Sequence, residues 1–133
     1  MSNLRLINDT SASSVAKVTI DNIFSEDYDI YKIVFSNMVQ SSNSATVSNL
    51  RFINSSGTEI SSSNYNYAKL VIRAGGSFSE NRAQDQSSLW HSIYNCVAES
   101  DFGGAEMWIF NPFTNGTYTT IINQSFFRYY GTS

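Results

Sequence analysis

Short runs in which apolar and polar residues alternate follow one another along the chain, and turn residues separate them. Successive side chains of a β-strand point to opposite faces of a sheet, so a period of two predicts strands and not helices. The pattern predicts eight strands and a short ninth piece near the end. They are Leu4–Asn8, Val15–Asp21, Ile30–Val39, Thr46–Asn54, Tyr65–Ala74, Ser87–Glu99, Ala105–Asn111, Thr117–Asn123 and Phe126–Tyr130.

The segments between these runs are rich in residues that form turns, as in SSNS, SSGT, SSSN, AGGS, DFGG and FTNG. One strand every ten residues or so is typical of a two-sheet sandwich. We see no linker and no internal repeat in the 133 residues. The pattern therefore predicts an all-β fold, an antiparallel two-sheet sandwich with jelly-roll-like topology, as a single domain over residues 1–133.

Composition agrees with this fold class. Ser, Thr and Asn fill 46 of the 133 positions, and these residues compete with helical hydrogen bonds while suiting turns and exposed strand faces. Only 14% of residues are charged, whereas 14% are aromatic. Aromatic and β-branched residues favour strands.

Charge and hydropathy exclude several classes of partner. The net charge is −3 and the eight basic residues are scattered singly, whereas nucleic-acid binding needs clustered Lys and Arg. No apolar run approaches the roughly 20 residues that span a bilayer, and the N-terminus lacks the apolar stretch of a secretion signal. The single cysteine, Cys96, fits a chain made in a reducing cytoplasm. We expect no nucleic acid and no membrane as partner.

The stretch SEDYDIYKIVF places three carboxylates in four positions. Ser25 stands where a helix N-cap would, with Glu26 and Asp27 in the turn that follows, so the acids are explained as the cap of a short 3₁₀ or helical turn. A calcium loop would need more oxygen ligands at alternate positions, and usually a glycine. The three carboxylates, Glu26, Asp27 and Asp29, are therefore predicted to have a structural role, and we expect no metal site.

No set of residues predicts catalysis. His91 and Cys96 are the only histidine and cysteine, and within one strand a separation of five directs them to opposite faces. His91 and Ser92 diverge in the same way. There is no zinc set, phosphate-binding loop or nucleophile elbow. We expect no catalytic residues and no cofactor.

Exposed aromatic residues can stack on sugars, and three residues are candidate glycan contacts: Tyr65, Tyr67 and Trp108. Tyr65, Tyr67 and Lys69 share one face of their strand. Around Trp108 both faces of the strand are partly apolar, which implies cover on both sides, from an opposing sheet or a neighbouring subunit. Core and interface roles are favoured over a sugar platform for these rings.

Three segments together resemble a group of small virion proteins of tailed bacteriophages, especially phages of marine cyanobacteria. The segments are FSEDYDIYKIVFSNM (Phe24–Met38), SSNYNYAKLVI (Ser62–Ile72) and WIFNPF (Trp108–Phe113). In that group a Phe-Ser-x-x-Tyr-x-x-Tyr-x-hydrophobic element precedes an Asn-Tyr-x-Tyr strand and an Ile-Phe-Asn-Pro element, and the order is the same here. The resemblance covers about Val15 to Tyr130. It implies a β-sandwich module that assembles on the particle, as head decoration, tail or fibre component, without catalytic residues.

The end of the chain departs from that group. Its members usually continue into a final strand pair with a Gly-Asn turn, whereas this sequence stops at FFRYYGTS. The resemblance therefore leads us to expect that a C-terminal strand pair is either absent from this sequence or supplied by another chain. The tail concentrates apolar bulk on both sides of any strand it forms, and we predict an interface there, made by Phe126, Phe127, Tyr129 and Tyr130.

These observations predict a non-enzymatic phage virion structural protein, either capsid decoration (cement) or a subunit of an external appendage. It would be synthesised in the host cytoplasm, located in the virion and bound to other virion proteins. A homo-oligomer is expected, and a trimer is favoured because phage appendages are often three-fold. The alternative is a lectin-like module that binds host surface glycans during adsorption.

Overall fold

The computed structural model describes residues 4–40, 47–73, 76–94, 96–97, 103–114 and 116–126. This part of the chain is all-β, with no helix, as predicted. Its strands are β1 (Ile30–Gln40), β2 (Val47–Leu50), β3 (Tyr65–Ile72), β4 (Phe78–Gln86), β5 (Leu89–Tyr94), β6 (Cys96–Val97), β7 (Gly103–Phe110) and β8 (Thr120–Phe126).

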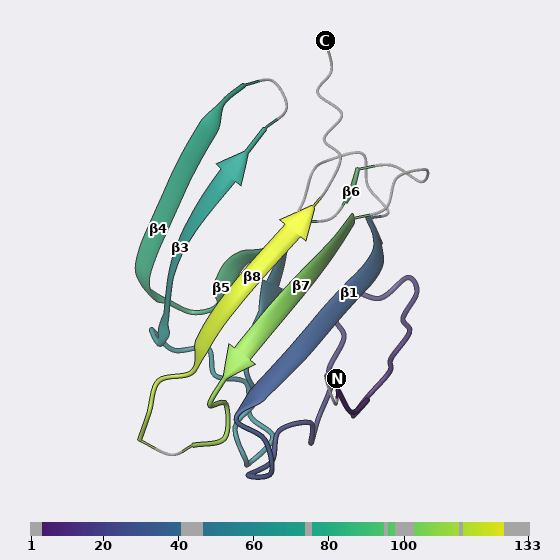
Figure 1. Cartoon of the computed structure of the whole chain (residues 1–133), viewed down its shortest axis with the longest axis vertical. Helices are drawn as coiled ribbons and strands as arrows, with labels where there is room; N and C mark the ends of the chain where they lie inside the picture. Colours follow the sequence, from purple (N-terminus) through teal and green to yellow (C-terminus); the bar gives the residue numbers. More distant parts are fainter. Residues whose placement is uncertain are drawn as a thin grey trace.

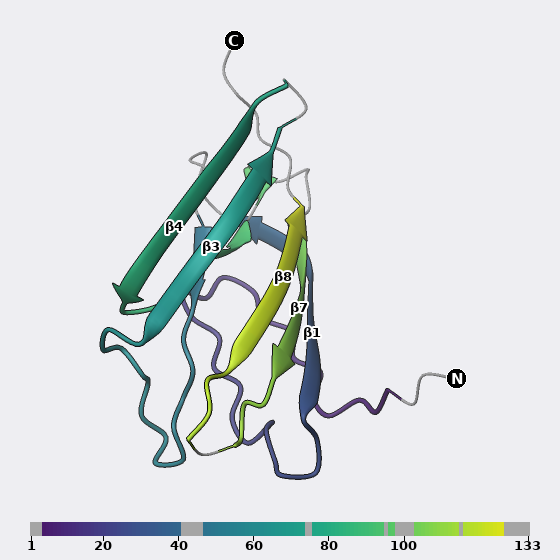
Figure 2. The same cartoon turned by 60° about the vertical axis from the view of Figure 1, so that its left-hand side comes forward.

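The strands form one four-stranded sheet and two strand pairs (Figure 1). The order in the large sheet is β6-β1-β7-β8, with β1, β7 and β8 antiparallel and the short β6 parallel to β1. The pairs β2–β5 and β3–β4 are both antiparallel. Figures 1 and 2 show hairpin β3–β4 alongside β8, with β3 and β8 running in the same direction. The arrangement is consistent with a β-sandwich.

The core lies on one face of the large sheet. In β7, the alternate residues Ala105, Met107 and Ile109 are buried, and Met107 and Ile109 have no exposed surface. Facing them on β1, Tyr31 is buried, and Ile33 and Phe35 are half-buried. Half-buried apolar residues from β1, β2 and β8 pack against Ala105 and Met107: Ile33, Phe35, Met38, Leu50 and Ile121. The alternate apolar residues that predicted β1 and β7 thus form the core.

The acidic stretch before β1 forms a turn, as predicted. The Asp27 N–H donates to Ser25 Oγ at 3.3 Å, and Ser25 Oγ donates to Asp27 Oδ2 at 3.1 Å. The turn is also fastened to the sheet, because the Tyr31 hydroxyl accepts the Ser25 N–H at 2.8 Å and donates to the Ser25 carbonyl at 3.0 Å. Asp27 therefore has a structural partner within its own turn.

Two predicted strands near the N-terminus are wrong. Neither Leu4–Asn8 nor Val15–Asp21 pairs with any strand in the described structure, and both are mostly exposed. Alternation makes a segment suitable for a strand, but a strand also needs a partner edge for its backbone.

The prediction missed β4 and merged β5 with β6. The sequence of β4, FSENRAQDQ, is too polar to read as a strand, but β3 supplies its hydrogen-bonding partner along almost its whole length. The segment predicted as one strand, Ser87–Glu99, is divided, because β5 pairs with β2 while β6 pairs with β1.

Pro112, the only proline, cannot donate to a strand ladder, and the Asn115-Gly116 pair after it is typical of a two-residue turn. The sequence here therefore predicts an antiparallel hairpin of the flanking strands, and the pairing is confirmed as β7–β8. Its connection differs from the expected two-residue Asn-Gly turn, since it runs from the end of β7 at Phe110 to the start of β8 at Thr120. Asn111 has a positive φ of 52° and donates its N–H to the Asp29 carbonyl at 2.8 Å. This bond continues the β1–β7 register by one pair, so the connection to β8 begins only after Asn111.

Candidate functional site

The face of the large sheet opposite the core carries exposed apolar side chains. Strand register places Lys32 opposite Trp108 and Trp108 opposite Ile122, so these side chains share that face. We call it the outer face and define it by one set of residues: Ile30, Lys32, Val34, Glu106, Trp108, Phe110, Ile122 and Phe126. Four of its apolar residues are exposed by more than half: Ile30, Val34, Ile122 and Phe126.

One neutralised ion pair lies in the middle of the outer face. Lys32 Nζ is 2.9 Å from Glu106 Oε1, and the Trp108 indole Nε1–H donates to the same oxygen at 2.9 Å. Lys32 Nζ also lies 5.0 Å from the centroid of the Trp108 ring. The hydrogen bonds from Lys32 and then Trp108 hold the pKa of Glu106 below its usual value. The carboxylate is therefore paired, and the surrounding face is apolar.

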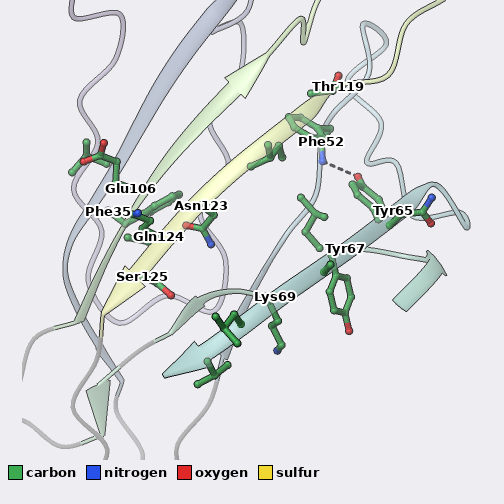
Figure 3. Close-up of a pocket in the computed structure, with 18 of the residues that line it drawn as sticks. Phe35, Phe52, Tyr65, Tyr67, Lys69, Glu106, Thr119, Asn123, Gln124 and Ser125 are labelled. Atoms are coloured by element: carbon green, nitrogen blue, oxygen red, sulfur yellow. Dashed lines mark hydrogen bonds between the residues drawn. The ribbon is translucent and has the colours of Figure 1, made fainter. Parts of the chain in front are cut away.

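A groove separates β3 from β8 (Figure 3). It has a volume of about 1360 Å³ and is lined by the whole of β3 and by most of β8. Residues 34–37 of β1 and Gly103, Ala105 and Glu106 of β7 complete the lining, so Val34, Glu106 and Phe126 belong both to the outer face and to the groove. Residues of both alternation classes of each strand line it, so the strands present their edges to the groove. Phe52, Ile60 and Leu89 add apolar surface.

Tyr65 closes one end of this groove from the core side. Its side chain is only 6% exposed. The hydroxyl accepts the Phe52 N–H at 2.9 Å, drawn as a dashed line in Figure 3, and donates to the Ile60 carbonyl at 2.9 Å. Burial raises the pKa of the phenol. A buried ring offers no face for a sugar, so the prediction of Tyr65 as a glycan contact is corrected to a structural role.

The other two predicted glycan contacts are half-buried and lie apart, in different sheets. Tyr67 is on β3 and has Lys69 Nζ 5.9 Å from its ring centroid. Burial lowers the pKa of Lys69. Trp108 is on β7 in the outer face, beneath Lys32. The structure thus does not bring the three predicted rings into one platform.

Of the predicted interface residues, only Phe126 lies among the described residues. It ends β8 and is 68% exposed. Phe127, Tyr129 and Tyr130 lie outside the described residues. The structure adds three exposed apolar residues of the outer face that the pattern alone did not single out: Ile30, Val34 and Ile122. For β1 the alternation already indicated such a face, because Ile30 and Val34 lie on the face opposite to that of Tyr31, Ile33 and Phe35.

His91 and Cys96 do not share a strand. His91 is in β5 and Cys96 is in β6, which belong to different sheets. The prediction that His91 and Cys96 lie in one strand is therefore wrong. The positions of their side chains lie outside the described structure.

Among the described residues, no group of three or more His, Cys, Asp or Glu residues is placed to hold a metal ion. In the same part of the chain, no helix has the length and apolarity to cross a membrane. Comparison of the chain with protein-family models, curated proteins and solved structures gives no match.

Proposed function

We propose that the chain is a non-enzymatic structural protein of a tailed-bacteriophage virion, a jelly-roll-like β-sandwich subunit of the capsid decoration or of an external appendage. The observation that carries this proposal is the outer face, where large apolar residues from three adjacent strands are exposed together. Contiguous apolar patches on soluble proteins mark interaction sites. The resemblance of three segments to small phage virion proteins supports a phage particle as the assembly to which the chain belongs.

Energetics favour a covered outer face. Full burial of a Val, Ile or Phe side chain contributes about 1.5–3 kcal/mol relative to exposure, and Ile30, Val34, Ile122 and Phe126 are each more than half exposed on this face. The Lys32–Glu106 pair is internally neutral, so covering the face does not bury an unpaired charge. A protein surface is therefore a suitable partner for it.

The partners that fit are further copies of the chain and other virion proteins. Soluble homo-oligomers are usually symmetric, and a trimer agrees with the three-fold symmetry frequent in phage appendages. The lectin-like alternative requires exposed rings, and the burial of Tyr65 together with the cation above Trp108 gives it no support.

The proposal is tested by size-exclusion chromatography with light scattering on the isolated protein, and by binding to purified virions of the phage that encodes it. We expect self-association or binding to the particle. The double substitution Ile30→Lys with Ile122→Lys should weaken either association by at least tenfold. Leu6→Lys is the control, because Leu6 is also a large apolar residue and is more exposed than Ile30 and Ile122, but it lies outside the sheet. A wild-type chain that stays monomeric and does not bind virions would exclude the proposal.

A further inference from the structure

Within the described part of the chain, the edges of β3 and β8 that line the groove carry few of the features that usually protect an edge against strand addition. β8 is the last of the described strands in its sheet, and its sequence TIINQSF contains no charge and no proline. β3 has one charged residue, Lys69, in eight. Edge strands are normally blunted by charges, prolines or covering segments. Among the described residues no strand occupies the groove between these edges.

The described chain also contains a strand-like segment without a partner strand. Val15–Asp21 alternates as a strand does, with Ala16, Val18 and Ile20 on one side and Val15, Lys17 and Thr19 on the other. It pairs with no strand in the described structure, and its valines are 57% and 50% exposed at positions 15 and 18. With seven residues it matches the length of β8. We call it the donor segment.

The donor segment does not reach the groove of its own chain. None of the residues that line the groove comes from residues 4–24. Figure 1 shows the purple N-terminal segment on the β1 side of the large sheet, away from hairpin β3–β4. An ion pair between Lys17 and Glu59 holds it there. A donor segment in the groove must therefore come from a second copy.

We propose that the donor segment of one copy occupies the groove of a second copy and pairs with both β3 and β8. Because β3 and β8 run in the same direction, a strand inserted between them is antiparallel to both or parallel to both. Addition of a strand to an exposed sheet edge is a recurrent mode of protein recognition, in which the backbone gives affinity and alternate side chains give specificity.

The chemistry of the two surfaces fits. The only charged residues among the described lining of the groove are Lys69 and Glu106. The donor face made by Ala16, Val18 and Ile20 is neutral and apolar, and it turns toward Phe52, Ile60 and Leu89. The opposite donor face carries Lys17 and Asp21 and turns toward solvent. This inference rests on the proposed role as an assembling subunit, and it assigns the contact that links the copies.

Two valines of the donor segment provide a matched test. Val18 is on the face that enters the groove and Val15 is on the solvent face, and both are about half exposed in the single chain. Val18→Asp should therefore raise the dissociation constant for self-association at least tenfold, whereas Val15→Asp should leave it within twofold. Both variants should keep the thermal midpoint of the wild-type monomer, because neither valine is in the core. Equal assembly of the two variants would overturn the strand exchange.

A second measurement does not depend on self-association. A synthetic peptide of residues 13–22 is added to the full-length Val18→Asp chain, and backbone amide shifts are followed by NMR. We expect shifts in β3 and β8, and none with the peptide that carries Val18→Asp. Absence of shifts with the native peptide overturns the strand exchange. Virion binding or assembly that persists in that case leaves the proposed function standing, so the two failures are distinguishable.

Discussion

The ring of Tyr65 lies parallel to that of Phe52, with 6.5 Å between centroids and 9° between planes, while the Tyr65 hydroxyl bonds the Phe52 N–H. One side chain thus contacts both the ring and the backbone of Phe52, which lies two residues after the end of β2. Through the Ile60 carbonyl it also holds the loop that leads to β3. This contact positions one wall of the groove.

Tyr65→Phe should lower the free energy of unfolding by about 1–3 kcal/mol, because the partly buried Phe52 N–H and Ile60 carbonyl lose their partner. Tyr118→Phe is the control, since Tyr118 is 96% exposed, and should change stability by less than about 0.5 kcal/mol. Urea denaturation measures both. Equal effects of the two substitutions would contradict the role assigned to the Tyr65 hydroxyl.

Alkaline pH should destabilise the fold through the same residue. Burial raises the pKa of Tyr65 above its ordinary value of 10.0, so above pH 10 the unfolded chain loses this proton before the folded chain does. Its contribution is fully present below pH 10 and decreases as the pH rises toward the folded pKa. The stability of Tyr65→Phe should fall less steeply than that of the wild type between pH 9 and 11, as followed by thermal melts. Parallel curves would argue against the buried phenol.

Gly104→Ala should destabilise the protein by about 1–3 kcal/mol, the usual cost of overpacking a filled site. A Cβ at this position would lie 2.9 Å from the Phe35 carbonyl oxygen and 2.9 Å from Cζ of Phe126. The backbone oxygen cannot move as an exposed side chain can. Adding Phe126→Ala should therefore restore only part of the loss in thermal denaturation. Full recovery would show that the ring alone causes the clash.

Ser25→Ala should destabilise the fold by about 0.5–2 kcal/mol, because Ser25 Oγ accepts the Asp27 N–H at the turn before β1. Asp27→Asn should cost only a few tenths to about 1 kcal/mol, because its side chain is exposed and keeps an acceptor for Ser25. Chemical denaturation compares them. Calorimetric detection of a stoichiometric calcium ion that is lost in Asp27→Asn would refute a purely structural role for this carboxylate.

Several features follow from the sequence alone, because they depend on local alternation. The all-β class, the core faces of β1 and β7, the Ser25 turn and the pairing of β7 with β8 are of this kind. In each case neighbouring residues supply the pattern, and a period of two fixes which side chains share a face. The predicted site residues depend less on local pattern: Tyr65 is buried by residues distant in the sequence, and the predicted interface stays a prediction, with Phe126 its only member among the described residues.

Only the tertiary structure decided which edges and segments are paired. β4 is a strand because β3 provides its hydrogen bonds, although its sequence is polar. Val15–Asp21 has the alternation of a strand and yet pairs with none in the described structure. The apolar outer face also appears only when Ile30, Trp108 and Ile122 are brought together from three strands. The alternation of a segment indicates which of its side chains can be buried. Its hydrogen-bonding partner and the surface that covers it come from residues far away in the chain.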